Sequence, residues 1–285
     1  MRVIRRGGFA ATAKPGNAPL RAVKMSQLLT SSRAMSPAKS LLLSSLLALP
    51  PAAGAADVRF HGYAYDLESG EHLYTEVHQQ NIEGERWLSG SITYLAPDGS
   101  LIGTKTLDFS QDPFIPVFRL ELKTGGGYAE GIAALGKDSI DMFRKGYKAS
   151  EPAEKTVARP PHTTADSGFH SLLRDRFPQL MDHKEVRFHF AVPGELDVFK
   201  FRARRIGDST FEDKPAVRFL VEPDTLLRLL ADPLEITYDP ANRQLVEYRG
   251  ISNLHDPATG DAYNVRIVYP SKPPAEAAKL PPAYR

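Results

Sequence analysis

Histidines gather near the start of the chain, where they and an acidic neighbour could bind a metal ion. The candidates are His61, His72, Glu76 and His78. Successive side chains of a strand point to opposite faces, so His72, Glu76 and His78 share one face of a strand expected from Glu71 to Gln80. Six residues separate His72 from His78 by roughly 20 Å, so the two cannot bind one metal ion. Glu76 and His78 could supply half a site, but a solvated strand face is the simpler interpretation. We expect no metal and no cofactor.

Arginines form a second candidate site, at Arg202, Arg204 and Arg205. Arg202 and Arg204 alternate with phenylalanines on an expected strand, so both point to its wet face. They could bind an anionic head group, although a ladder of ion pairs across neighbouring strands is the simpler interpretation. The glycine triplet at 125–127 lacks the lysine and the helix start of a phosphate-binding loop. The sequence also has no Gly-x-Ser-x-Gly elbow, so we assign no catalytic residue.

One stretch has the three- and four-residue spacing of an amphipathic helix. Its apolar stripe comprises Phe169, Leu172, Leu173, Phe177 and Leu180. Asp166 or Ser167 can cap this helix, and Pro178 should kink it or end its regular part. The stripe could cover one end of a sheet or roof a ligand cavity, and we expect the roof. The expected ligand contacts are Phe169, Leu172, Leu173, Phe177, Arg202 and Arg204.

Most of the remaining chain alternates apolar and polar residues between short turns. The clearest part runs from Asp232 to Tyr269, where turns at 239–242 and 256–260 separate three alternating runs. Such a pattern predicts an antiparallel meander. The same design recurs from Val58 onward and predicts about twelve strands in a barrel or strongly curved sheet, with one main helix packed on it. A short helical turn is also expected at Thr225 to Leu230. An outer-membrane barrel is the competing architecture, but prolines and charges interrupt the strands.

The first 55 residues differ in composition from the rest and predict a leader. They hold eight basic and no acidic residues, and an apolar run from Leu41 to Leu49 precedes small residues at 53–55. This pattern indicates a signal peptide cleaved near Ala55-Ala56, with the true start at Met25 or Met35. An organellar transit peptide is the alternative. The apolar run is too short to span a bilayer, so we expect no integral membrane span.

Charge and cysteine content restrict the function of the mature chain. Of 36 basic and 34 acidic residues, 28 basic and 34 acidic ones lie beyond the leader, a net charge of 28 − 34 = −6. This balance argues against nucleic-acid binding. The chain has no cysteine, hence no disulfide and no thiol for lipid attachment. We expect a soluble periplasmic protein with one β-rich domain at 56–270, an exposed linker at 148–164 within it, and a disordered tail at 271–285.

Three segments carry a resemblance to a known group. Tyr65-Asp66-Leu67, Gly168-Phe169 through Val192-Pro193, and YDPANRQLVEYRGISN at Tyr238 to Asn253 resemble a group of uncharacterised bacterial periplasmic proteins. That resemblance covers most of the mature chain and implies no activity. A curved antiparallel sheet wrapped on a helix is also similar, in architecture alone, to the lipoprotein-carrier (LolA/LolB-like) proteins of the envelope.

Two functions follow from these expectations. One is a non-enzymatic binding or carrier module for an apolar, lipid-like ligand. The alternative is a structural or interaction protein of the cell envelope, with a filled core and no ligand. The two differ in cavity volume, because a ligand site should be a concave space of about 300 Å³ or more with a mostly apolar lining.

Overall fold

The computed structural model describes residues 56–224 and 233–285. The leader at 1–55 and the helical turn expected at Thr225 to Leu230 lie outside the described residues. In the described part, no helix is long and apolar enough to cross a membrane.

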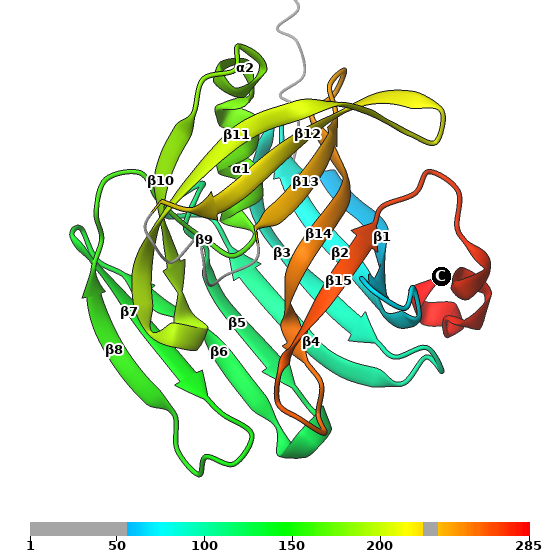
Figure 1. The fold of residues 1–285 in the computed structure, drawn as a ribbon. Helices are drawn as coiled ribbons and strands as arrows, with labels where there is room; N and C mark the ends of the chain where they lie inside the picture. Colours follow the sequence, from blue (N-terminus) through cyan, green and yellow to red (C-terminus); the bar gives the residue numbers. More distant parts are fainter. Residues whose placement is uncertain (1–55, 225–232) are drawn as a thin grey trace, which may run out of the picture. The chain divides into compact units, whose positions relative to one another are not determined.

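A single curved sheet dominates the structure (Figure 1). Its strands are β1 (Ala56–Asp66), β2 (His72–Glu83), β3 (Arg86–Leu95), β4 (Leu101–Asp108), β5 (Val117–Leu122), β6 (Tyr128–Leu135), β7 (Ser139–Lys145), β8 (Ala153–Ala158), β9 (Thr163–Ala165), β10 (Val186–Val192), β11 (Asp197–Phe211), β12 (Lys214–Pro223), β13 (Leu234–Asp239), β14 (Gln244–His255) and β15 (Ala262–Val268). The order across the sheet is β8-β7-β6-β5-β4-β3-β2-β1-β15-β14-β13-β12-β11-β10-β9. All neighbours are antiparallel except β9 and β10, as expected for strands joined mainly by short turns.

The sheet is open and has more strands than the sequence predicted. Within residues 56–224 and 233–285 the sheet has fifteen strands instead of about twelve, and its two end strands, β8 and β9, are not paired with each other. Strand β8 lies within 148–164, where we expected an exposed linker, and β9 begins there at Thr163. Most side chains of β8 are exposed, so this strand has no apolar alternation to reveal it. Its backbone groups are instead satisfied by pairing with β7.

The predicted helix is divided into two. It consists of α1 (Gly168–Asp175) and α2 (Phe177–Met181), with Arg176 between them. Pro178 lies in the first turn of α2, where its missing N–H costs no helical hydrogen bond. The expected interruption at Pro178 is therefore confirmed. A Cβ at Gly168 would lie 2.0 Å from the Phe114 carbonyl oxygen, so a glycine is needed where α1 meets this backbone.

The apolar stripe of the helices fills a core. Phe169, Leu172, Leu173, Phe177 and Leu180 are buried and pack against side chains of β10 to β13. A separate cluster, which includes Leu120, Ile132 and Ile140, lies over the strands from β2 to β7. The helices therefore cover the β10–β13 part of the sheet, and most of the stripe is occupied by packing there.

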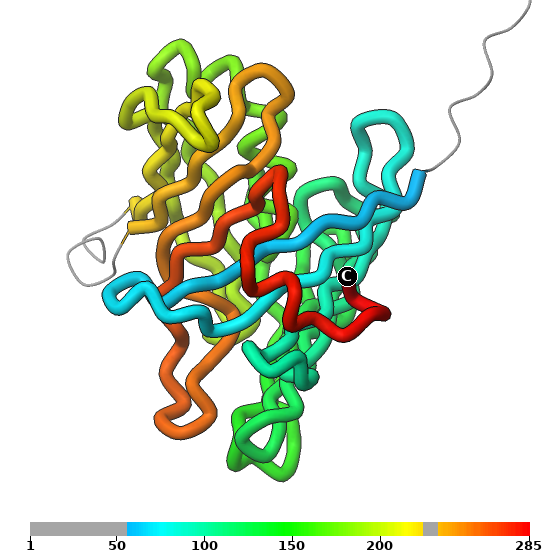
Figure 2. Tube along the Cα trace, turned by 90° about the vertical axis from the view of Figure 1, so that its right-hand side faces the viewer, coloured from blue at the N-terminus to red at the C-terminus, as the bar shows by residue number. Residues whose placement is uncertain are grey.

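The carboxyl-terminal segment is docked, contrary to the disordered tail that we expected. It forms two short 3₁₀ helices, η4 (Ala275–Lys279) and η5 (Pro282–Tyr284). Leu280 is buried against Val77 and Leu95, and the His61 imidazole lies 2.7 Å from the Tyr284 carbonyl oxygen. Figure 2 shows this red segment beside the blue and cyan strands. The segment is rich in Pro and Ala, so its composition did not indicate that Leu280 would be buried. The burial of this leucine favours the docked state.

Candidate functional site

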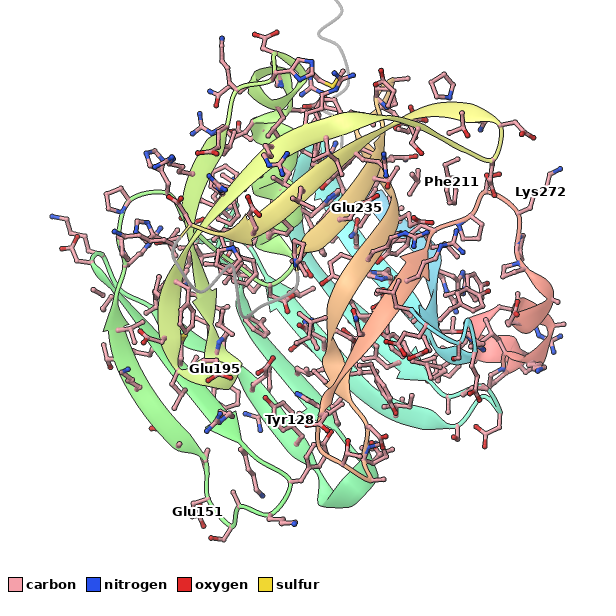
Figure 3. All side chains as sticks on the ribbon, viewed as in Figure 1. Tyr128, Glu151, Glu195, Phe211, Glu235 and Lys272 are labelled. Carbon is pink, nitrogen blue, oxygen red and sulfur yellow. The ribbon has the colours of Figure 1, made fainter. Side chains whose placement is uncertain are left out.

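A cavity of about 700 Å³ lies within the curve of the sheet. It is lined by residues of β1 to β4, of α1, and of β10 to β15. Its aromatic lining residues include Phe60, Tyr74, Trp87, Tyr94, Phe169, Tyr248 and Tyr269. The lining also includes Phe211, at the tip of the β11–β12 hairpin, and Ser271. Figure 3 labels Phe211, and it labels Lys272, which follows Ser271 in the chain. The volume is within the range of ligand sites, about 300 to 1,000 Å³.

A buried ion pair lies in the cavity wall. Lys105 of β4 donates to the Asp166 carboxylate at 2.6 Å, and their side chains are only 2% and 3% exposed. Asn253 donates to the same oxygen at 2.9 Å. Burial is the largest single effect and would raise the pKa of Asp166, but the Lys105 ammonium and the hydrogen bonds from Lys105 and Ser167 together outweigh it, and the pKa is lowered. We conclude that the Asp166 carboxylate is ionised at neutral pH in the folded protein.

The loop before α1 positions the Asp166 carboxylate of this ion pair. Asp166 has a φ of 44°, in the left-handed region that Asp tolerates better than most residues. Its second carboxylate oxygen accepts hydrogen bonds from the backbone N–H and the hydroxyl of Ser167, at 2.6 and 2.7 Å. The sequence identified Asp166 only as a possible helix cap. The sequence did not identify Lys105, although Lys105 shares the buried face of β4 with Gly103 and Leu107.

Glu76 and His78 form a second buried pair, which corrects the solvated face that we expected. Their side chains lie 2.8 Å apart and are each 9% exposed. Tyr269 donates to Glu76 at 3.1 Å, and Phe60 stacks on His78 with ring centroids 4.4 Å apart. Gly62 gives them room, because a Cβ there would lie 2.6 Å from Tyr269 and 2.9 Å from Glu76. Within 56–224 and 233–285, no three His, Cys, Asp or Glu side chains are grouped to hold a metal ion.

A third polar pair joins α1 to β13. The Nδ1 atom of His170 lies 2.9 Å from the Tyr238 hydroxyl oxygen, and the two rings stack with an interplanar angle of 4°. Burial lowers the pKa of His170 to about 3, and the positive charge of Arg174 contributes. The imidazole is therefore neutral at neutral pH.

His170 should make the protein acid-sensitive. Because its folded pKa is lowered, the unfolded chain takes up a proton that the folded chain does not, and stability falls as pH decreases from about 6.5 toward about 3. We expect His170→Asn to reduce this loss by up to about 2 kcal/mol at pH 4.5. Urea denaturation at pH 7 and at pH 4.5 measures the loss of unfolding free energy between the two pH values. His162→Asn, at an exposed position with a φ of 58°, is the control. Equal acid losses in His170→Asn and the unsubstituted protein would contradict the prediction.

Of the ligand contacts predicted on the helix, one lies in the cavity wall and the others lie in the core. Phe169 lines the cavity, whereas Leu172, Leu173 and Phe177 are buried in the helix core and do not line it. Most of the stripe therefore does not roof the cavity, because the β10–β13 side chains already cover it.

Arg202 and Arg204 also lie outside the cavity lining. Arg202 of β11 donates two hydrogen bonds, at 2.6 and 3.0 Å, to Glu222, which lies opposite it on β12. The Arg204 guanidinium lies 3.8 Å from the same carboxylate. The two arginines are therefore part of an ion-pair ladder, the competing interpretation of their alternation.

Comparisons with known proteins identify no family. No family model matches the chain, and no curated protein matches it. Among solved structures, the chain is similar to a β-barrel-like protein of the domain of unknown function DUF1849 from Brucella abortus. The two share 10% sequence identity over 76% of this chain and 100% of that one, with a TM-score of 0.43.

Proposed function

We propose that this protein is a non-enzymatic binding or carrier module for a mainly apolar, lipid-like ligand held in the cavity of the curved sheet. The observation that carries the proposal is the cavity itself. Its volume of about 700 Å³ exceeds the threshold of about 300 Å³ that separates a ligand site from a filled core. Aromatic and aliphatic side chains from both halves of the sheet supply apolar contact area.

The polar groups in the wall favour binding over catalysis. Lys105 is paired with Asp166, Glu76 with His78, and His170 with Tyr238. Asp166, whose pKa is lowered, and His170, whose pKa is lowered to about 3, are both poor general bases near neutral pH. These pairs can instead fix the wall and satisfy its buried charges, while the rings between them contact the ligand.

The proposed place of action is the periplasm. The acid-free leader with its apolar run at 41–49 supports export, and the resemblance to periplasmic proteins and lipoprotein carriers agrees with it. Amino-terminal sequencing of the mature protein tests this address. We expect a chain that starts near Ala56, whereas a cytoplasmic chain that starts at Met1 or Met35 would contradict it.

Ligand binding can be tested by filling the cavity. Leu245 is partly exposed and lines the cavity, so a larger ring at this position can extend into the open space. We expect the unsubstituted protein to bind a dansyl-labelled fatty acid saturably, and Leu245→Trp to weaken this binding about tenfold. Lys155→Trp, on exposed β8 away from the cavity, should bind normally.

The alternative function makes the opposite prediction. A structural or interaction protein of the envelope would show no saturable binding by any of these proteins. The exposed edge strand β8, which is paired with β7 on one side, would then be the first surface to test for a protein partner.

A further inference from the structure

We propose that the ligand carries an anionic group, a carboxylate or a phosphate, and that Arg174 and Arg243 bind it at the α1 end of the cavity. This inference rests on the proposed function and specifies the ligand's chemistry. Both arginines line the cavity. They are distinct from Arg202 and Arg204, which were among the ligand contacts expected from the sequence.

Arg174 is a cation with no carboxylate partner among the described residues. It lies in the last turn of α1. Its Nε is buried without a hydrogen-bond partner in that part of the chain, and no ion pair there includes its guanidinium. Arg205 and Arg218 also have an unpartnered Nε, but each forms an ion pair through a terminal nitrogen. A buried donor without a partner costs about 1 to 3 kcal/mol, so an anionic ligand would remove a cost that the empty protein bears.

Arg243 adds a second guanidinium at this end. The turn between β13 and β14 presents it, with a φ of 57° at Arg243 and an Asp239 side chain that accepts from the Ala241 N–H at 2.8 Å. The Arg243 Nη1 lies 3.5 Å from the Arg174 carbonyl oxygen, which places the two residues side by side. Its Cζ is 5.8 Å from the Phe177 ring centroid, so the ring helps to hold the guanidinium.

Five acidic residues line the cavity, namely Glu76, Glu85, Asp166, Glu212 and Asp239, and none of them forms an ion pair with Arg174 or Arg243 among the described residues. Asp166 accepts from Lys105, Glu76 from Tyr269 and Glu212 from the Ser271 N–H. Asp239 is engaged in its own turn. Arg174 also contributes to the low pKa of His170, which is consistent with positive potential at this end. Guanidinium groups match the geometry of carboxylates and phosphates. A fatty acid and a lipid phosphate are thus the two sources of one recognised chemistry.

Three ligands with the same chain length test the proposal: laurate, dodecyl phosphate and dodecanol. Trp87, the chain's only tryptophan, lines the cavity and reports binding by its fluorescence. We expect the full mature protein to bind laurate or dodecyl phosphate at least tenfold more tightly than dodecanol. Tighter binding of laurate indicates a fatty acid as the ligand, and tighter binding of dodecyl phosphate indicates a lipid phosphate.

Variants assign the preference to the two arginines. We expect Arg174→Gln to weaken anion binding about tenfold or more and to leave dodecanol binding unchanged. Arg243→Gln tests the same point at an exposed turn, where folding should be unaffected, and Arg204→Gln is the control outside the cavity. Equal binding of dodecanol and the anions, insensitive to Arg174→Gln and Arg243→Gln, would overturn the anionic-group proposal and leave the proposed function standing. No binding of any of the three ligands would overturn both.

Discussion

Asp166→Asn is expected to lower the free energy of unfolding by about 3 kcal/mol, among the largest effects of any single substitution in this protein. The substitution removes the charge that compensates Lys105, whose side chain is only 2% exposed. Asn tolerates the positive φ at this position, so the change reports on charge and adds little backbone strain. Urea denaturation at neutral pH measures the effect.

A second substitution separates the cost of a lone charge from the value of the pair. Lys105→Met in the Asp166→Asn background should recover most of the lost stability, because no uncompensated charge remains buried. The control pair is Arg119 and Glu121, whose side chains are about half exposed, and Glu121→Gln there should cost less than about 1 kcal/mol. A loss below about 1 kcal/mol for Asp166→Asn would show that the Lys105 ammonium reaches water.

Phe177→Ala is expected to cost about 3 to 5 kcal/mol, as a substitution that creates a cavity in a closed core. The Phe177 ring is 4% exposed and makes edge contacts with Phe219 and Tyr238, at centroid distances of 5.3 and 5.8 Å. Thermal and urea denaturation measure the loss.

The same variant also tests the position of the ligand. Because Phe177 does not line the cavity, the folded fraction of Phe177→Ala should still bind a fluorescent fatty acid, with at most a partial weakening from the lost contact between the ring and the Arg243 guanidinium. Ile251→Ala, at a side chain 61% exposed, should change stability by less than about 0.5 kcal/mol. A small stability loss combined with lost binding would restore the roof that the sequence suggested.

The sequence by itself determined the mainly β class of the fold and the turns of its carboxyl-terminal meander. The turns predicted at 239–242 and 256–260 lie where β13 is followed by β14 and where β14 is followed by β15. These elements could be predicted because the alternation of side chains and the φ preferences of turn residues act over a few residues. The position of Pro178 likewise indicated the break between α1 and α2.

Only the tertiary structure decided the site. Lys105 and Asp166 are 61 residues apart, and Tyr269 and Glu76 are 193 apart, so neither pair has a local signature. A charged side chain on an alternating strand looks solvated until its partner is placed opposite it, which is why Glu76 and His78 were assigned to the wet face. The helix stripe could not show whether it met a cavity or side chains of β10 to β13. The exposed strand β8 and the anchoring Leu280 depend on backbone pairing and on a single buried contact, and neither leaves a periodic pattern in the chain.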